Sequence, residues 1–330
     1  MEAGLSVWLD RPVTEAADMA VAAEKAGFGD LWVPDHYFLR DVYVAQAVMA
    51  ERTSAIRLGT AVSAALLRHP SLLASSTATI DELSGGRAIL GLGTGGFEFP
   101  SQLDLRADSP LTLVKEAVAI TRQLFAGGSD VNGRVFTARG ARLGWDTRPI
   151  PIYLAARGPK MLELAGEIAD GVITHGLAPS HLEFVQERIA AGADRAGRDP
   201  EACELCMMFG VEIDDDEDAA IDRQRPHCTI MAGGAYAESL IPIYGLDPAE
   251  VAPLKAAVSA GAPDAADLVT PAMVRAFTLS GSEATLAAGL RDLAAAGVGR
   301  VITSINRDPS ATDTEGRIAQ LGRVIEEVSQ

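Results

Sequence analysis

The chain has 330 residues, of which 48% are hydrophobic and 22% are charged, and its formal net charge at pH 7 is −17. This composition is typical of a globular protein with a large buried core. The negative charge argues against a protein that binds nucleic acid along its phosphate backbone, since such proteins present a positive field. We therefore expect no nucleic acid partner.

The length fits either two ordinary domains or a single (β/α)8 barrel. The N-terminal residues lack the basic region of a signal peptide, and no apolar stretch reaches the roughly 18 residues that span a bilayer. Three cysteines are too few for a disulfide framework in a chain of this length. These features predict a cytoplasmic protein that does not enter a membrane.

Short apolar runs alternate with helical patterns along the whole chain. The runs predict strands, and most are apolar throughout, as in a parallel sheet that is buried on both faces. The eight predicted strands cover about residues 5–9, 30–35, 56–62, 88–93, 150–156, 171–176, 205–213 and 298–305. Helices are predicted near residues 14–26, 42–52, 71–83, 111–125, 161–168, 180–196 and 314–328.

Boundary signals agree with this alternation. Gly27, Gly171 and Gly297 each lie between a predicted helix and the next strand, where glycine commonly ends a helix. Ser280 and Glu283 form a capping-box pattern, which predicts that a further helix begins there and buries leucines in its first three turns.

Eight strand–helix units with right-handed crossovers close a barrel. The predicted fold is therefore an α/β (β/α)8 TIM barrel, a single domain over residues 1–330. Two insertions interrupt it: about residues 97–148 after strand four, with a hairpin-like turn near Asn132–Gly133, and about residues 214–279 after strand seven. An open, doubly wound sheet is the alternative.

In a barrel, functional residues lie at the C-terminal ends of the strands. His36 directly follows the second predicted strand and has Asp35 beside it. Imidazole titrates near pH 6.5, and a neighbouring carboxylate can fix its tautomer. A lone histidine is usually structural, but this position makes His36 a candidate for proton transfer.

The stretch Gly91–Gly96 formally matches the pattern G-x-G-x-x-G of dinucleotide-binding proteins. That pattern requires a helix to begin at once and hold the pyrophosphate, whereas no helical pattern resumes here until about residue 111. The glycines fit either a tight turn or a loop that brings backbone N–H groups to a cofactor.

Two further patterns are interpreted as structural. Cys203 and Cys206 form C-x-x-C, but residues three apart on a strand face opposite sides, so neither a zinc site nor a redox pair is expected. The acidic run at 214–218 fits a solvated helix start and lacks the spacing of a calcium loop. We expect no metal.

Several motifs together resemble the luciferase-like monooxygenase superfamily, in particular its branch that depends on coenzyme F420, a deazaflavin. The motifs are Val33–His36, Arg57–Val62, Arg68–Pro70, Leu83–Arg87, Leu90–Gly95 and Ala156–Gly166, and the last is similar to methylenetetrahydromethanopterin reductases. The resemblance implies a TIM barrel that binds F420, or FMN, at its C-terminal face. It also implies an oxidoreductase that transfers a hydride between the cofactor and a small organic substrate, commonly as a homodimer.

Carried over to this sequence, the resemblance implies that the cofactor ring packs on a bulge with a cis peptide bond between Ala61 and Val62. It also implies a catalytic His36, with Glu98 as a weaker candidate for a second acid. The positions implied to bind the cofactor are Asp35, Ala61, Val62, Ala64, Thr94, Gly95, Arg157, Gly158 and Lys160.

The sequence also departs from its relatives. Gly96 stands where the related enzymes have an acid, and Trp8 stands where the pterin reductases have another. These changes predict a different substrate, with a pocket that diverges at Trp8, Glu98 and His175.

Three alternatives stay open at this point. The first is an FMN-dependent monooxygenase on the same barrel. The second is a barrel that binds flavin or another ligand without catalysis, since the usual acids are missing. The third is a nicotinamide enzyme, which predicts an open sheet and a helix directly after Gly96.

Overall fold

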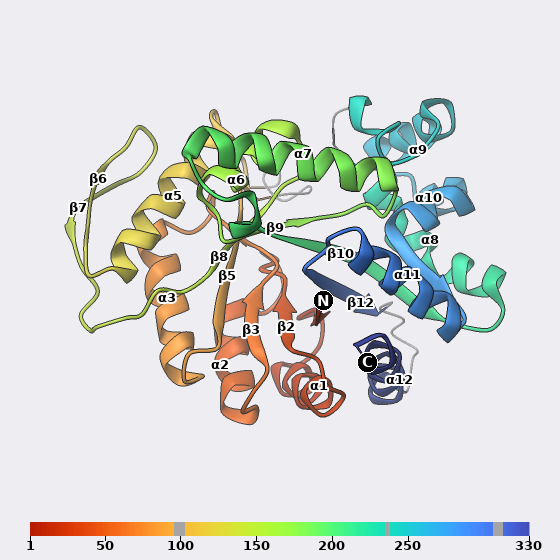
Figure 1. The fold of residues 1–330 in the computed structure, drawn as a ribbon, viewed down its shortest axis with the longest axis horizontal. Helices are drawn as coiled ribbons and strands as arrows, with labels where there is room; N and C mark the ends of the chain where they lie inside the picture. The colour runs from red at the N-terminus through yellow and green to blue at the C-terminus, as the bar shows by residue number, and fades with distance from the viewer. Residues whose placement is uncertain (96–102, 235, 237, 306–312, 330) are drawn as a thin grey trace.

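A computed structural model describes residues 1–95, 103–234, 236, 238–305 and 313–329. Its central feature is a closed barrel of parallel strands surrounded by helices (Figure 1). In order around the barrel, the strands are β1 (Glu2–Ser6), β2 (Asp30–Val33), β3 (Arg57–Thr60), β5 (Ala88–Gly93), β8 (Ile152–Ala155), β9 (Gly171–Thr174), β10 (Glu204–Ile213) and β12 (Arg300–Ile305).

Pairing of β12 with β1 closes the barrel, with Glu2 opposite Arg300 and Leu5 opposite Thr303. The predicted TIM barrel is thus confirmed. The open sheet, and with it the nicotinamide alternative that required one, is wrong because β9 also pairs with β10 and leaves no edge between the two halves.

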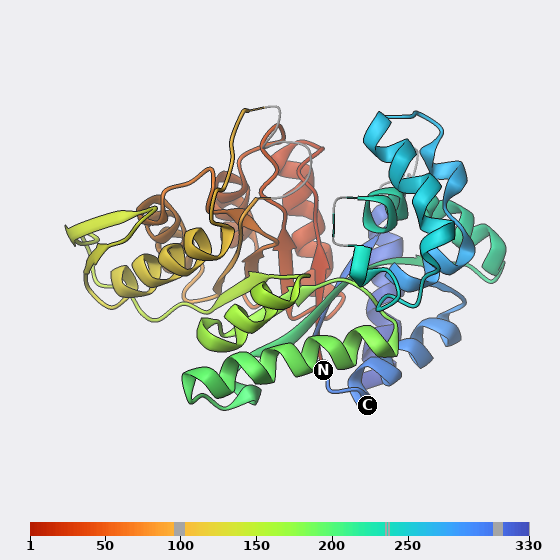
Figure 2. The same ribbon diagram turned by 90° about the horizontal axis from the view of Figure 1, so that it is seen from above.

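Helices cover the outside of the barrel (Figures 1 and 2). They are α1 (Val13–Lys25), α2 (Val42–Arg52), α3 (Pro70–Leu83), α5 (Pro110–Phe125), α6 (Pro159–Ile168), α7 (Pro179–Ala196), α11 (Glu283–Ala295) and α12 (Thr314–Ser329). Alternate strand residues such as Leu5, Leu58 and Leu90 face these helices and are fully buried among helical side chains. Because the other residues of each strand face inward, both faces need apolar side chains, which explains the unbroken apolar runs.

Two large aromatic side chains fill the middle of the barrel. Trp32 and Tyr153 meet edge-on with ring centroids 5.6 Å apart. A Cβ atom added at Gly4 or Gly59 would lie 2.7 Å or less from the Trp32 ring, and one at Gly171 would lie 2.3 Å from Tyr153. Gly171 therefore makes room for Tyr153 as the first residue of β9, and its predicted role as a helix terminator is wrong.

Charged side chains close the N-terminal end of the barrel. Asp30 and Arg300 begin β2 and β12, are almost fully buried, and form an ion pair. Arg57 Nε lies 2.6 Å from Asp30 Oδ1, and Arg300 Nε donates to Glu204 Oε2 at 3.0 Å. Tyr153 also donates to Glu204. Because the charges are mutually paired, this end of the barrel has a structural role.

Within the first predicted insertion, an antiparallel hairpin projects from the barrel (Figure 1). It consists of β6 (Ser129–Asn132) and β7 (Thr137–Ala141). Glu116 of α5 accepts hydrogen bonds from three successive N–H groups of the turn, those of residues 134–136, at 2.7–2.8 Å. The hairpin-like signal in the sequence is thus confirmed.

The second predicted insertion forms a group of helices with an apolar core of its own. Its elements are α8 (Glu217–Gly233), η2 (Glu238–Leu240), α9 (Pro248–Ala260), η3 (Ala265–Leu268), α10 (Pro271–Phe277) and the short strand β11 (Thr278–Gly281). Tyr244, Leu254 and Phe277 are among its buried residues. β11 continues the sheet along the C-terminal half of β10, with Gly210 opposite Thr278.

Some predicted boundaries are corrected. β1 ends at Ser6, so Trp8 lies beyond the strand end rather than inside it. The helix predicted to begin at Ser280 begins at Glu283, and its cap is Ser282, whose hydroxyl accepts from Thr285 N at 3.2 Å. Ser280 itself lies in β11. The leucines of α11 are buried as predicted, and Asp216, in the middle of the acidic run, caps α8.

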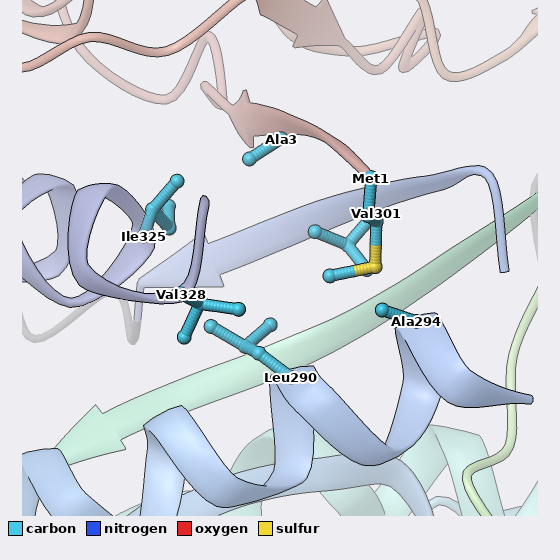
Figure 3. Close-up of a pocket in the computed structure, with 7 residues that line it drawn as sticks. All are labelled: Met1, Ala3, Leu290, Ala294, Val301, Ile325 and Val328. Atoms are coloured by element: carbon cyan, nitrogen blue, oxygen red, sulfur yellow. The ribbon is translucent and has the colours of Figure 1, made fainter. Parts of the chain in front are cut away.

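A small cavity lies between β1, β12, α11 and α12 (Figure 3). The side chains that line it are all apolar and come from Met1, Ala3, Leu290, Ala294, Val301, Ile325 and Val328. Since Met1 precedes β1 and Ala3 lies near the start of that strand, this cavity lies away from the strand ends expected to carry function. Among the described residues, no helix has the length and apolar character needed to cross a membrane.

Candidate active site

Small side chains face the barrel axis at the C-terminal ends of the strands. Ser6 shares the inner face of β1 with Gly4, and Ser304 shares that of β12 with Ile302, because side chains alternate along a strand. Ala61 packs against the Trp32 cluster, and a Cβ at Gly93 would lie 3.4 Å from Ala155 Cβ. The Ser6 hydroxyl is buried without a hydrogen-bond partner in the described part of the chain. The side chains at the bottom of the barrel mouth are therefore small and mostly apolar, and the Ser6 hydroxyl can form a hydrogen bond with a bound molecule.

The end of β3 forms one wall of this mouth. The peptide bond between Ala61 and Val62 is cis, as predicted. The Val62 side chain lies over β5, where added Cβ atoms at Gly91 and Gly93 would be 3.2 and 2.9 Å from its methyl groups. Thr60 Oγ1 donates to the Gly91 carbonyl at 2.6 Å and accepts from Gly91 N at 3.0 Å. Glycine in β5 thus lets two backbones approach closely under Val62.

The loops after β2 and β5 meet above β4 (Ser63–Ala64). Gly95 has a φ of +101°, and a Cβ there would lie 2.5 Å from the Tyr37 hydroxyl and 3.2 Å from Ala64 Cβ. Leu66 N donates to the Thr94 carbonyl at 3.3 Å. The predicted positions Thr94, Gly95 and Ala64 are therefore brought together with the loop that carries His36.

Asp35 is held by protein groups. Its Oδ2 accepts from Ser63 Oγ at 2.9 Å and from Arg68 Nε at 3.0 Å. The buried Tyr43 hydroxyl lies 3.0 Å from Ser63 Oγ, and since the Ser63 proton goes to Asp35, Tyr43 is the donor. Arg68 Nη2 also donates to Asp41 at 2.7 Å. The Asp35 carboxylate thus joins the His36 loop to β4, and a cofactor contact by Asp35 stays a prediction.

His36 faces the end of β1. Its ring centroid lies 5.9 Å from that of Trp8, and the two planes are inclined by 58°. Both side chains are partly buried. The Trp8 indole therefore limits the orientations that the His36 imidazole can adopt next to the small side chains of the barrel mouth.

At the end of β8, Arg157 turns toward α8. Its Nη2 lies 3.1 Å from Met231 Sδ, and its Cζ lies 6.0 Å from the Tyr236 ring centroid. Gly158, the N-cap of α6, has open space where a side chain would stand. Lys160 is exposed in the first turn of α6. Gly158 and Lys160 thus lie at the exposed start of α6, whereas Arg157 faces the helical insertion, and cofactor contacts by these residues stay predictions.

The end of β9 carries a neutral histidine. His175 Nδ1 lies 3.0 Å from the Met208 carbonyl oxygen, which can only accept, so Nδ1 carries the proton. Burial, and then the nearby charge of Arg157, lowers the pKa of His175 well below its usual 6.5. His181 behaves alike: burial lowers its pKa to about 4, and its Nδ1 lies 2.9 Å from the Gly176 carbonyl.

Two positions singled out in the sequence, Gly96 and the second predicted acid Glu98, lie outside the described residues. In the parts of the chain that are described, no group of three or more His, Cys, Asp or Glu side chains could hold a metal ion. Cys203 and Cys206 are free thiols in two different buried clusters; Cys203 lies just before β10 rather than in it, and Cys206 lies within the strand.

Sequence reasoning assigned no role to several residues near the site. Arg68 stood in a recognised motif, but its bond to Asp35 spans 33 positions and no local pattern reveals it. The only signal in the sequence that Tyr37 lies near the site was its position next to His36. Gln224 and His227 come from the second predicted insertion, whose placement over the barrel no periodicity in the sequence predicts.

Comparisons with known proteins agree with this geometry. The model of the luciferase-like monooxygenase family matches residues 3–300. The chain is 34% identical to 5,10-methylenetetrahydromethanopterin reductase of Methanolobus tindarius, over 95% of this chain and 96% of that protein. It is 32% identical to the enzyme of the same name from Archaeoglobus fulgidus, over 98% of both chains. The solved structure of the coenzyme F420-dependent tetrahydromethanopterin reductase of Methanopyrus kandleri superposes with a TM-score of 0.89 at 28% identity, over 99% of both chains.

Proposed function

The chain belongs to the luciferase-like monooxygenase family, and on this premise we propose that it is an oxidoreductase that uses coenzyme F420 to transfer a hydride to or from a small organic substrate. Relatives of known name at 32–34% identity that cover nearly the whole chain are methylenetetrahydromethanopterin reductases. The solved relative with the same fold depends on coenzyme F420.

One observation carries the proposal: apart from Met208 and His175, the inner-facing residues at the strand ends are small and leave the barrel mouth incompletely filled. Ser6, Ala61, Gly93, Ala155 and Ser304 lie above the layer that contains Trp32 and Tyr153. Elsewhere in the barrel such positions are filled by large side chains. A flat tricyclic ring therefore fits at this end, with Val62 beneath it and backbone N–H groups of the β5 loop at its rim.

The bound deazaflavin supplies a carbon that accepts or gives up two electrons as a hydride. The chain itself supplies the rest of the chemistry. His36 would hold the proton that accompanies hydride transfer, since imidazole can give and take a proton near neutral pH. Val62, Ala61 and Trp8 would exclude water from the ring, and the start of α6 at Gly158 and Lys160 would receive the anionic tail.

The assignments of Ala64, Thr94 and Gly95 to cofactor binding are retained as part of the proposal. Their support is position: Gly95 has a conformation that side chains rarely adopt, and it brings the β5 backbone against Ala64 and the His36 loop. Asp35 is also kept as a proposed cofactor contact, although Ser63 and Arg68 already hold its carboxylate. Arg157 is a weaker candidate for the cofactor, because it turns toward α8.

We also propose that the protein is a cytoplasmic homodimer. The three cysteines are free and buried, as is usual in a reducing compartment. Val44 on α2 and Leu72 on the neighbouring helix α3 are each 60% exposed, and Phe38, which precedes α2 in the chain, is 58% exposed. Exposed apolar side chains of this kind would be covered by association with a second copy.

Titration of the purified protein with F420 and, separately, with FMN tests the proposed function. We expect saturable binding of F420, followed by change of its absorbance on mixing the reduced complex with a panel of carbonyl, imine and enoate compounds. Tighter binding of FMN than of F420 would reject the cofactor assignment. Binding of F420 without turnover of any compound would instead favour a non-catalytic barrel.

A further inference from the structure

One face of α8 lies along the barrel mouth and presents polar side chains to it. Gln224, His227 and Met231 follow the spacing i, i+3, i+7, so they lie on the same side of the helix. Met231 contacts Arg157 at the end of β8. An added Cβ at Gly210 of β10 would lie 2.9 Å from Gln224 Oε1 and 3.1 Å from His227 Cδ2.

Gly210 places this face on the inner side of the barrel. It is two residues from Met208, which packs against the Trp32 cluster, and residues two apart share one side of a strand. α8 packs on β10 and β11, so its stripe from Gln224 to Met231 runs from the end of β10 toward the end of β8. Seven residues of helix span about 10 Å, which is the length of a small organic molecule.

Gln224 is unusual within this stripe. The side chain is fully buried, and neither its amide nitrogen nor its amide oxygen has a hydrogen-bond partner among the described residues. Burying such a group without a partner destabilises the folded state, so a sequence selected for stability alone would place an apolar residue here. The amide has both a donor and an acceptor to offer to a bound molecule.

Arg157 supplies the charge at the other end of the stripe. Its guanidinium forms no ion pair with any described carboxylate, and its single polar contact is a thioether sulfur, which is a weak acceptor. The neighbouring His175 and His181 are neutral and add no second cation. A half-buried guanidinium with unused donors is suited to a carboxylate, which it can bind through two parallel hydrogen bonds.

Resting on the proposed function, we propose that α8 and the ends of β8–β10 form the substrate compartment, and that the substrate is an organic acid. Arg157, beside Met231, binds its carboxylate, and the Gln224 carboxamide, two turns earlier on α8, binds a polar group at the other end of the molecule. In this proposal Arg157 binds the substrate rather than the cofactor tail. The second predicted insertion, through α8, then helps to determine which substrate binds.

Calorimetric titration of the F420-loaded protein with three probes tests the proposal. The probes are 4-hydroxybenzoate, benzoate, which lacks the far hydroxyl, and 4-hydroxybenzamide, which lacks the charge. We expect 4-hydroxybenzoate to bind at least tenfold more tightly than 4-hydroxybenzamide. Arg157→Gln should abolish that difference, and Gln224→Met should abolish the preference for 4-hydroxybenzoate over benzoate.

Controls separate this outcome from a general loss of charge or of folding. Arg142→Gln removes an exposed cation of the hairpin region and should leave all three affinities within twofold of the wild-type values. Gln224→Met should raise Tm, because it removes unpaired buried polar atoms while it lowers affinity. Equal binding of the acid and the amide by the wild type would overturn the proposal.

Two further results would also overturn it, in different ways. A tenfold loss of F420 affinity in Arg157→Gln would return this arginine to the cofactor tail. Binding of inorganic phosphate more tightly than 4-hydroxybenzoate would reject the carboxylate class. Failure of the wild type to bind F420 at all would instead reject the proposed function itself.

Discussion

At the scale of single residues, His36 bears the main chemical role in the proposed site. It lies beside Trp8 at the end of β2, next to the small floor of the barrel mouth. We predict that His36→Asn lowers kcat by about 10²- to 10⁴-fold, the usual contribution of a positioned general acid or base, and changes F420 affinity less than threefold. Stopped-flow turnover and fluorescence titration measure the two quantities.

His69→Asn is the matched control for this prediction. His69 caps α3 by accepting from Ser71 N at 3.2 Å, and an asparagine oxygen can replace that contact. Its kcat should stay near the wild-type value. Full turnover by the His36 variant would remove His36 from the chemistry and leave it as a packing residue.

Arg68 is a positioning residue, because it acts on the His36 loop through Asp35. Its partner is only 7% exposed, so Arg68→Met leaves a nearly buried carboxylate without its cation. We predict a loss of about 3 kcal/mol in the free energy of unfolding. Arg52→Met breaks an exposed pair with Asp18 and should cost less than about 1 kcal/mol. Urea denaturation compares them, and equal losses would show that the Asp35 pair is no more than a surface contact.

The ends of the predicted strands could be found from the sequence. From them, Thr94 and Gly95 were correctly expected to lie near the loop that carries His36. Partners far apart in the chain could not be found, since neither Arg68 nor Gln224 carries a local signal. The roles of the predicted site residues stay predictions, and Glu98 lies outside the described residues.

At the scale of elements, partly buried glutamates fasten loops to helices. Glu24 of α1 accepts from the N–H groups of Ser54, Ala55 and Ile56, at 2.9, 2.7 and 2.9 Å from its Oε2. Glu24→Gln keeps the shape but removes the charge, so we predict a loss of about 1–2 kcal/mol in unfolding free energy at pH 7. Glu51→Gln, an exposed position on α2, is the control and should have no measurable effect.

The Glu24 effect should depend on pH in a defined direction. Burial, the largest single influence, raises the pKa of Glu24, but the N–H groups of Ile56, Ala55 and Ser54 together lower it from 4.5. A carboxylate with a lowered folded-state pKa stabilises the protein above its unfolded pKa and loses that effect as the pH falls through the folded value. The difference in unfolding free energy between wild type and Glu24→Gln should therefore shrink below pH 4.5. A difference that stays constant down to pH 3 would contradict the charged clamp.

Elements with both faces buried were predictable, because long apolar runs and helical spacing mark them plainly. Errors arose where tertiary contacts set the boundary. β1 begins at Glu2, since its pairing with Arg300 at the start of β12 fixes the register. Ser280 fitted a capping box but is drawn into β11 by pairing with Glu212 of β10.

At the scale of the whole molecule, the two ends of the barrel have different tasks. The N-terminal end is closed by Arg300, Asp30 and Glu204, and the proposed site lies at the other end. Arg300→Met leaves two acidic groups without their buried cation, so we predict a loss of about 3–5 kcal/mol in unfolding free energy. F420 affinity of the folded variant should stay within twofold of the wild type. Loss of affinity without loss of stability would contradict this separation.

The closed barrel could be predicted because eight strand–helix units and right-handed crossovers leave few alternatives. The placement of α8 over the mouth could not, because its residues are buried against two different partners and no single apolar stripe identifies the face that meets the barrel. The extent of the chain as one domain, the homodimer and the cytoplasmic location stay predictions.

A crystal structure of the protein with F420 bound would test most directly whether the ends of the strands form one cofactor site. We predict the deazaflavin ring at the C-terminal barrel mouth, resting on Val62 and beside Gly95, with His36 facing its reactive edge and its tail directed toward Gly158. A ring bound elsewhere, or a mouth filled by protein side chains while F420 is bound, would contradict the proposed site.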